Sequence, residues 1–169
     1  MGNADLPAMV TRISIWVAVA AWAGVIAGLL RGRRGRCLRF TWTIGLVAYL
    51  LHVMAAFAGF YRWSHAVAYA ETARQTAEQT GFSSGFGLWL NYLVAALWGI
   101  DVARWWITGK VRPEGMMRKL WWGWHVFLAF MIFNGTIVFG HGPVRWYGVA
   151  IFTVLAAIAW RAMLKPLRD

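Results

Sequence analysis

M-V-T-R-I-S-I-W-V-A-V-A-A-W-A-G-V-I-A-G-L-L (9–30) runs directly into R-G-R-R-G-R-C-L-R (31–39), an apolar stretch followed by a basic one. A helix needs about 20 mostly apolar residues to cross a bilayer core of about 30 Å, and the first stretch supplies them. A cleaved signal peptide would be shorter and would carry its basic residues before the apolar run. The sequence therefore predicts a retained membrane span with its N-terminus outside.

Four further stretches have the same character, so we predict an all-α fold. Of the 169 residues, 60% are hydrophobic and only 14% are charged, whereas soluble proteins are about 45–50% apolar and about 25% charged. The alternation of an outer-membrane barrel is absent. We expect one transmembrane domain over 1–169, a polytopic bundle of five helices plus a short outer-face helix, with spans at about 9–30, 38–61, 86–108, 119–140 and 144–164.

The basic residues predict the orientation of these spans. Twelve Lys and Arg fall on one side and four on the other, which places the richer side in the cytoplasm. The net charge of +11 does not indicate a nucleic-acid partner, because the basic residues sit in short clusters between apolar runs. We expect a multi-pass protein of the bacterial inner membrane, with its C-terminus in the cytoplasm. The twelve are Arg31, Arg33, Arg34, Arg36, Arg39, Lys110, Arg112, Arg118, Lys119, Arg161, Lys165 and Arg168.

Two other features support this layout. Aromatic residues gather near the span ends, as expected of an interfacial belt that needs no functional explanation; they include Trp42, Tyr61–Trp63, Trp105–Trp106, Trp121–Trp122 and Trp146–Tyr147. The long connection 64–85 lies on the outer side and is rich in helix formers. Because Gly81 is suited to a helix C-cap, we expect a short helix there that covers the outer mouth of the bundle.

Polar residues inside a membrane are costly and are therefore the first candidates for function. Asp101 and His125 fall at matched depth, each about 10 Å inside the cytoplasmic boundary, on two spans joined by a short loop. Such a pair could relay protons, or the carboxylate could orient the imidazole as a ligand. The alternative is that Asp101 pairs with Arg104, three residues further along the same helix.

His52 lies near the centre of the second span, with Gly45 and Gly59 seven residues to either side on one helix face. Glycines would let either a helix or a planar macrocycle approach, so His52 is a candidate axial ligand of one b-type heme. Close helix packing is the alternative. A second ligand from His125 would need helix tilt, because the two histidines differ in depth by about 9 Å.

His65 and His141 both fall at the outer ends of spans, where together with Glu71 and Glu78 on the outer helix they offer nitrogen and oxygen ligands suited to Zn or Cu. Two exposed histidines that are simply solvated are the alternative. Motifs for nucleotide binding, zinc proteolysis and serine hydrolysis are absent from the sequence, so an enzyme acting on its own is not indicated.

W-S-H-A-V-A-Y-A-E-T-A-R-Q-T-A-E-Q-T-G (63–81), N-Y-L-V-A-A-L-W-G-I-D-V-A-R-W-W (91–106) and F-N-G-T-I-V-F-G-H-G-P-V-R-W (133–146) resemble a family of small, uncharacterised bacterial multi-pass membrane proteins. The resemblance implies the topology and carries no activity or ligand. The expected span count and orientation also match the membrane b-type cytochrome subunit of respiratory nitrate reductases, as a likeness of layout without a shared motif.

Three functional hypotheses follow. The first is a small electron- or proton-transfer subunit of a membrane complex that binds one b-type heme. The second is a non-catalytic structural or assembly subunit that packs against other membrane subunits. The third is an outer-face metal-binding protein.

Overall fold

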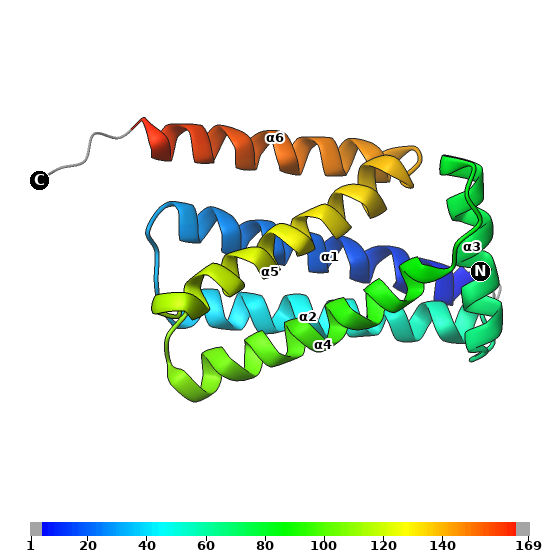
Figure 1. Cartoon of the computed structure of the whole chain (residues 1–169), viewed down its shortest axis with the longest axis horizontal. Coiled ribbons are helices and arrows are strands. Elements are labelled where there is room, and N and C mark those ends of the chain that lie inside the picture. Colours follow the sequence, from blue (N-terminus) through cyan, green and yellow to red (C-terminus); the bar gives the residue numbers. More distant parts are fainter. Residues whose placement is uncertain (1–4, 165–169) are drawn as a thin grey trace, which may run out of the picture.

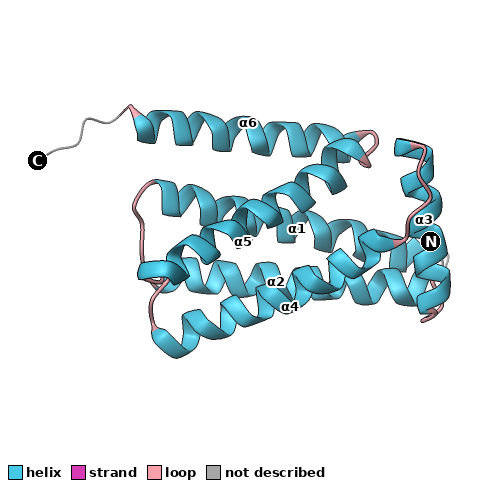
Figure 2. Ribbon diagram, in the orientation of Figure 1, coloured by secondary structure: helices cyan, strands magenta, loops and turns pink. Residues whose placement is uncertain are grey.

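The computed structural model describes residues 5–164, and in this part of the chain all regular structure is helical (Figure 2). The all-α prediction is confirmed. The elements are α1 (Asp5–Leu30), α2 (Arg36–Gly59), α3 (His65–Thr80), α4 (Phe86–Thr108), α5 (Gly115–Phe133), the π-helix η1 (Asn134–Val138) and α6 (Pro143–Met163).

Five of the helical segments are long and apolar enough to cross a membrane: α1, α2, α4, α5 with η1, and α6. The chain is thus a multi-pass membrane protein. The helices run alternately between two ends of the bundle, and α3 lies across one of them (Figure 1). We call this the α3 end, and we call the opposite end, which carries the loops 31–35 and 109–114, the basic end. Lys165 and Arg168 lie outside the described residues, and which end faces the cytoplasm stays a prediction.

The helix bounds follow local sequence signals. α4 covers the predicted span 86–108, and α1 begins at Asp5 with Pro7 in its first turn, where a proline costs no hydrogen bond. Ser64 caps α3 by accepting a hydrogen bond from the Val67 amide, and Gly81 ends it in the left-handed region at φ 79°. The short helix predicted in the connection 64–85 is therefore present as α3, and it ends before Gly81 as predicted.

The bundle is built around the α1–α2 hairpin, the most extensive helix pair. α4 packs on α2, α6 packs on α1, and η1, which continues α5, packs on α6; in the view of Figure 1, α5 passes obliquely in front of α1. Tryptophans fill the centre, and Gly45 makes room for one of them, since a Cβ there would lie 2.7 Å from the Trp98 ring. The largest fully buried side chains are Trp42, Trp98, Trp105, Leu29, Leu128, Val25 and Val94.

A surface ion-pair network on α3 makes this helix sensitive to acid. Arg74 contacts both Glu71 and Glu78, and its hydrogen bond lowers the pKa of Glu71 to about 2. A depressed carboxyl pKa stabilises the fold above the unfolded-state pKa of about 4.3, and this contribution is lost as the pH falls toward 2. We therefore expect the amide protection factors in α3, which are corrected for the intrinsic exchange rate at each pH, to fall between pH 5 and pH 2. Arg74→Gln should flatten that pH dependence, and an unchanged profile would contradict the assignment.

Candidate functional site

Asp101 lies at the centre of a buried polar cluster near the basic end. Its Oδ1 accepts hydrogen bonds from Nε and Nη2 of Arg104, at 3.0 and 2.7 Å, and from the Trp105 indole at 3.1 Å. Its Oδ2 accepts from the Trp42 indole at 3.0 Å and the Trp121 indole at 3.3 Å. Asp101 is 5% exposed, so this carboxylate is held almost entirely by protein donors.

These contacts join three helices at one point. Trp42 belongs to α2, Asp101 to α4 and Trp121 to α5, while Arg104 also donates to the backbone carbonyls of Lys110 and Val111 in the next loop. A carboxylate offers about four lone-pair positions, and this one already receives five donors. All acceptor positions of the Asp101 carboxylate are therefore occupied, and the cluster is a structural junction between the three helices.

The tryptophans of this junction correct one expectation from the sequence. Trp42, Trp105 and Trp121 are 0%, 0% and 4% exposed and are not part of an interfacial belt. Trp106 and Trp146, by contrast, are 44% and 71% exposed, as the belt predicts. An indole carries one N–H donor, so a buried tryptophan needs an acceptor, and Asp101 supplies it for three of them.

His125 is brought next to this junction but does not hydrogen-bond to Asp101. Its ring lies 4.4 Å from the Trp121 ring and 5.3 Å from the Trp42 ring, between centroids. The side chain is 3% exposed, and neither ring nitrogen has a hydrogen-bond partner within the described residues. Asp101 and His125 thus share two indoles, Trp42 and Trp121, as neighbours. A proton relay between them stays a prediction.

His52 lies on a different side of the bundle, seven residues before the end of α2. Its Nδ1 is 2.8 Å from the backbone carbonyl of Thr11 on α1. A carbonyl oxygen can only accept, so Nδ1 carries the proton and, in the neutral ring, Nε2 is left with a free lone pair. Tyr49, one helical turn away, donates its hydroxyl to the Asn91 carbonyl at 2.9 Å.

Protein side chains fill the space beside the two glycines on the His52 face of α2. A Cβ on Gly45 would meet Trp98, and a Cβ on Gly59 would lie 2.5 Å from Pro7. These glycines serve close helix packing, which is the alternative weighed for them from the sequence. Heme binding at His52 stays a prediction.

A cavity of about 460 Å³ opens at the α3 end, within the size range of small-molecule sites. His52 lines it from α2, and the buried side chains of Trp98 and Leu128 also line it, whereas His125 is not among its lining residues. The π-helix η1 forms one side, and such π turns are frequent at functional sites. The polar side chains that line it are Tyr49, His52, Tyr61, Thr72, Gln75, Thr76, Asn91, Tyr92, Asn134, Thr136 and Tyr147.

The two histidines proposed for an outer metal site are both exposed at the α3 end. His65 begins α3 and packs against the rings of Trp89 and Tyr92, with centroids 5.2 and 5.8 Å away. His141 lies in the loop before α6. Within residues 5–164 no group of three or more His, Cys, Asp or Glu is placed to hold a metal ion. A two-histidine site stays a prediction.

Sequence reasoning missed the three indoles on Asp101 and the cavity beside His52. Trp105 could have been found, because it lies four residues after Asp101 on the same helix face. Comparisons with protein-family models, with curated proteins and with solved structures give no match. Any proposal about function must therefore rest on the geometry of the site.

Proposed function

We propose that this membrane protein binds a neutral, lipid-soluble molecule of the hydroquinone class in the cavity at the α3 end. This would be the binding step of the electron- or proton-transfer role predicted from the sequence. The observation that carries the proposal is His52, whose Nδ1 is fixed by the Thr11 carbonyl so that Nε2 is an acceptor beside the cavity.

An acceptor at this place suits a ligand hydroxyl. Most other polar groups of the cavity already donate hydrogen bonds within the protein. The hydroxyls of Thr136, Tyr147 and Tyr49 donate to the backbone carbonyls of Ile132, Trp16 and Asn91, respectively. The His52 Nε2 has no partner among the described residues. A hydroquinone hydroxyl would donate to it while the ring rests on the aromatic walls.

The charge of the lining supports a neutral ligand. None of its residues, all within the described part of the chain, is an Asp, Glu, Lys or Arg. An anionic ligand would lose its hydration there without gaining a cationic partner, which is costly in a low-dielectric interior. Apolar side chains, mainly from α1, α2, α4 and α5, make up more than half of the lining residues and match a lipid-soluble ring.

Binding of duroquinol to the purified protein under argon, measured by calorimetry in detergent, tests the proposal. Replacing His52 with phenylalanine keeps the ring volume and removes the acceptor. We expect affinity to fall about tenfold, which corresponds to the loss of one hydrogen bond of about 1–1.5 kcal/mol. The matched control is His65→Ala, which removes an exposed imidazole that does not line the cavity and should change affinity less than twofold.

Two results would contradict the proposal. One is the absence of duroquinol binding to a folded wild-type protein. The other is equal affinity of wild type and His52→Phe, which would place the ligand elsewhere. Thermal unfolding of both variants checks that any loss is not a loss of fold.

A b-type heme on His52 is the competing candidate, because a fixed Nδ1–H is also how ligating histidines are oriented. The fit is poorer. A heme carries two propionates, and the cavity lining offers no cationic side chain to them. The glycine face is filled by Trp98 and Pro7, and His125 does not reach the cavity as a second ligand. A Soret band in the purified protein that disappears in His52→Phe would favour heme over hydroquinone.

A further inference from the structure

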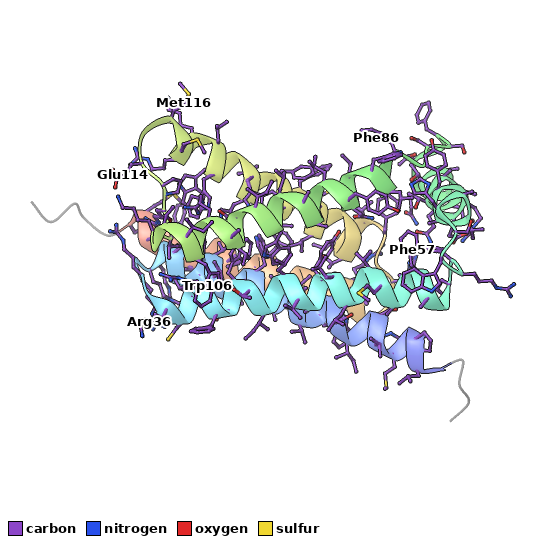
Figure 3. The ribbon with its side chains drawn as sticks, turned by 90° about the horizontal axis from the view of Figure 1, so that it is seen from below. Arg36, Phe57, Phe86, Trp106, Glu114 and Met116 are labelled. Carbon is purple, nitrogen blue, oxygen red and sulfur yellow. The ribbon has the colours of Figure 1, made fainter. Side chains whose placement is uncertain are left out.

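A second cavity, of about 570 Å³, lies at the basic end between the loops 31–35 and 109–114 and the start of α5. Figure 3 shows Glu114, Met116 and Arg36 gathered at this end, away from Phe57 and Phe86 at the other. Since it opens where the helices leave the membrane, it is at the depth of lipid headgroups. Its walls differ sharply from those of the cavity beside His52.

The lining of this cavity is strongly cationic. Arg34, Lys110, Arg112 and Arg118 face it, and Glu114 is the only carboxylate among its lining residues. Glu114 is already paired with Lys110 at 2.9 Å, an exposed contact. Three arginines therefore remain without a carboxylate partner among the described residues.

Arg112 is held in place as part of the wall. Its Nη2 donates to the Leu29 carbonyl at the end of α1, and its guanidinium lies 6.0 Å over the Trp122 ring. Its Nε is buried with no hydrogen-bond partner in the described structure. Burial and the nearby Arg34 both lower the pKa of Arg112, as expected where like charges converge without a counter-ion.

We infer that this cavity binds a phosphate-bearing anion, with Arg34, Arg112 and Arg118 as its ligands. Guanidinium groups match phosphate geometry with paired N–H donors, and basic pockets at the membrane surface are suited to anionic headgroups. An anion held there would neutralise the three converging arginines and bridge the α1–α2 and α4–α5 loops. This site is independent of the hydroquinone cavity, which lies at the opposite end.

The chain offers a matched charge control for the test. Arg34 and Arg118 line the cavity, whereas Arg33 and Lys119 are their immediate neighbours and do not. The full-length protein is placed in nanodiscs of phosphatidylcholine containing 10% cardiolipin, which carries two phosphates. Retained lipid is counted by native mass spectrometry. We expect Arg34→Gln with Arg118→Gln to weaken cardiolipin retention about 30-fold, since each basic side chain near a headgroup contributes about fivefold. Arg33→Gln with Lys119→Gln should change retention less than threefold.

A second measurement separates the two sources of phosphate. Pyrophosphate is titrated onto the protein in pure phosphatidylcholine nanodiscs. Binding that is lost in the Arg34/Arg118 variant but kept in the Arg33/Lys119 variant supports a soluble ligand, whereas the same pattern with cardiolipin alone supports a lipid. Equal losses in the two double variants would show a diffuse surface charge and overturn the site. So would the absence of both cardiolipin and pyrophosphate binding.

Discussion

Replacing Asp101 with asparagine is expected to lower the apparent unfolding temperature of the protein in mild detergent by about 10 °C. The substitution keeps the size of the side chain but leaves the Arg104 guanidinium, 19% exposed, without a counter-charge. Removing one partner of a buried ion pair lowers the free energy of unfolding by about 3–5 kcal/mol. Each 1 kcal/mol lowers the unfolding temperature of a domain of this size by about 2–4 °C. The asparagine amide would also place an N–H₂ donor where a carboxylate oxygen accepts hydrogen bonds from the indoles, so at least one indole N–H would lose its acceptor. Circular dichroism during heating measures the effect.

The exposed pair on α3 is the control. Glu78→Gln removes a carboxylate from Arg74, but both side chains are 56% exposed, so water screens the contact. We expect a shift of less than 2 °C. A second variant, Asp101→Asn with Arg104→Met, removes both charges while the asparagine Oδ1 can still accept from the indoles, and it should recover part of the loss. If Asp101→Asn melted like the wild type, the junction between α2, α4 and α5 would not depend on this carboxylate.

The helices could be predicted because their signals are local. A run of apolar residues of the right length predicts a span wherever it occurs, and Gly81 ends α3 through its own left-handed φ. The end of α5 could not be predicted in this way. A π-helix over Asn134–Val138 replaces the expected α-helical turns, and periodicity does not distinguish the two.

The site could be predicted only in part, because it depends on which helix faces meet. The pairing of Asp101 with Arg104 was weighed from their spacing of three residues, and the structure contains it. The indoles of Trp42 and Trp121 come from other helices, 59 and 20 residues away along the chain. Hydropathy gives the depth of a residue and not its direction. Depth therefore placed Asp101 level with His125 but could not show that tryptophans lie between them.

The two ends of the bundle thus have different physical characters. At the basic end, Asp101 joins three helices through its hydrogen bonds, and Arg34, Arg112 and Arg118 line a cationic cavity nearby. At the α3 end, η1 carries the chain away from α-helical geometry and toward α6. A cavity with no charged side chain lies beside it. The conformation of η1 should therefore control the shape of the cavity beside His52.

Gly140→Ala is expected to disrupt this region more than any other single-methyl addition in it. A Cβ on Gly140 would lie 1.9 Å from the backbone oxygen of Thr136 and 2.6 Å from its carbonyl carbon. No side-chain rotation relieves a clash with backbone, so the end of η1 must rearrange. Overpacking of this kind costs about 3 kcal/mol. Thr136 and Phe139 both line the cavity, so duroquinol affinity should fall at least tenfold together with the unfolding temperature.

Gly135→Ala is the control, since it adds the same methyl group within η1, five residues before Gly140. A Cβ on Gly135 meets no heavy atom within 4 Å, so stability should be unchanged or slightly raised. Gly135 itself lines the cavity, so the methyl group can lower duroquinol affinity by its bulk, but by less than Gly140→Ala and without a loss of stability. Calorimetry measures duroquinol affinity, and thermal unfolding measures stability, for both variants. Equal behaviour of Gly140→Ala and Gly135→Ala would mean that the tight turn at Gly140 does not shape the cavity. A Gly140→Ala protein with lowered stability but intact affinity would separate the π-helix from ligand binding.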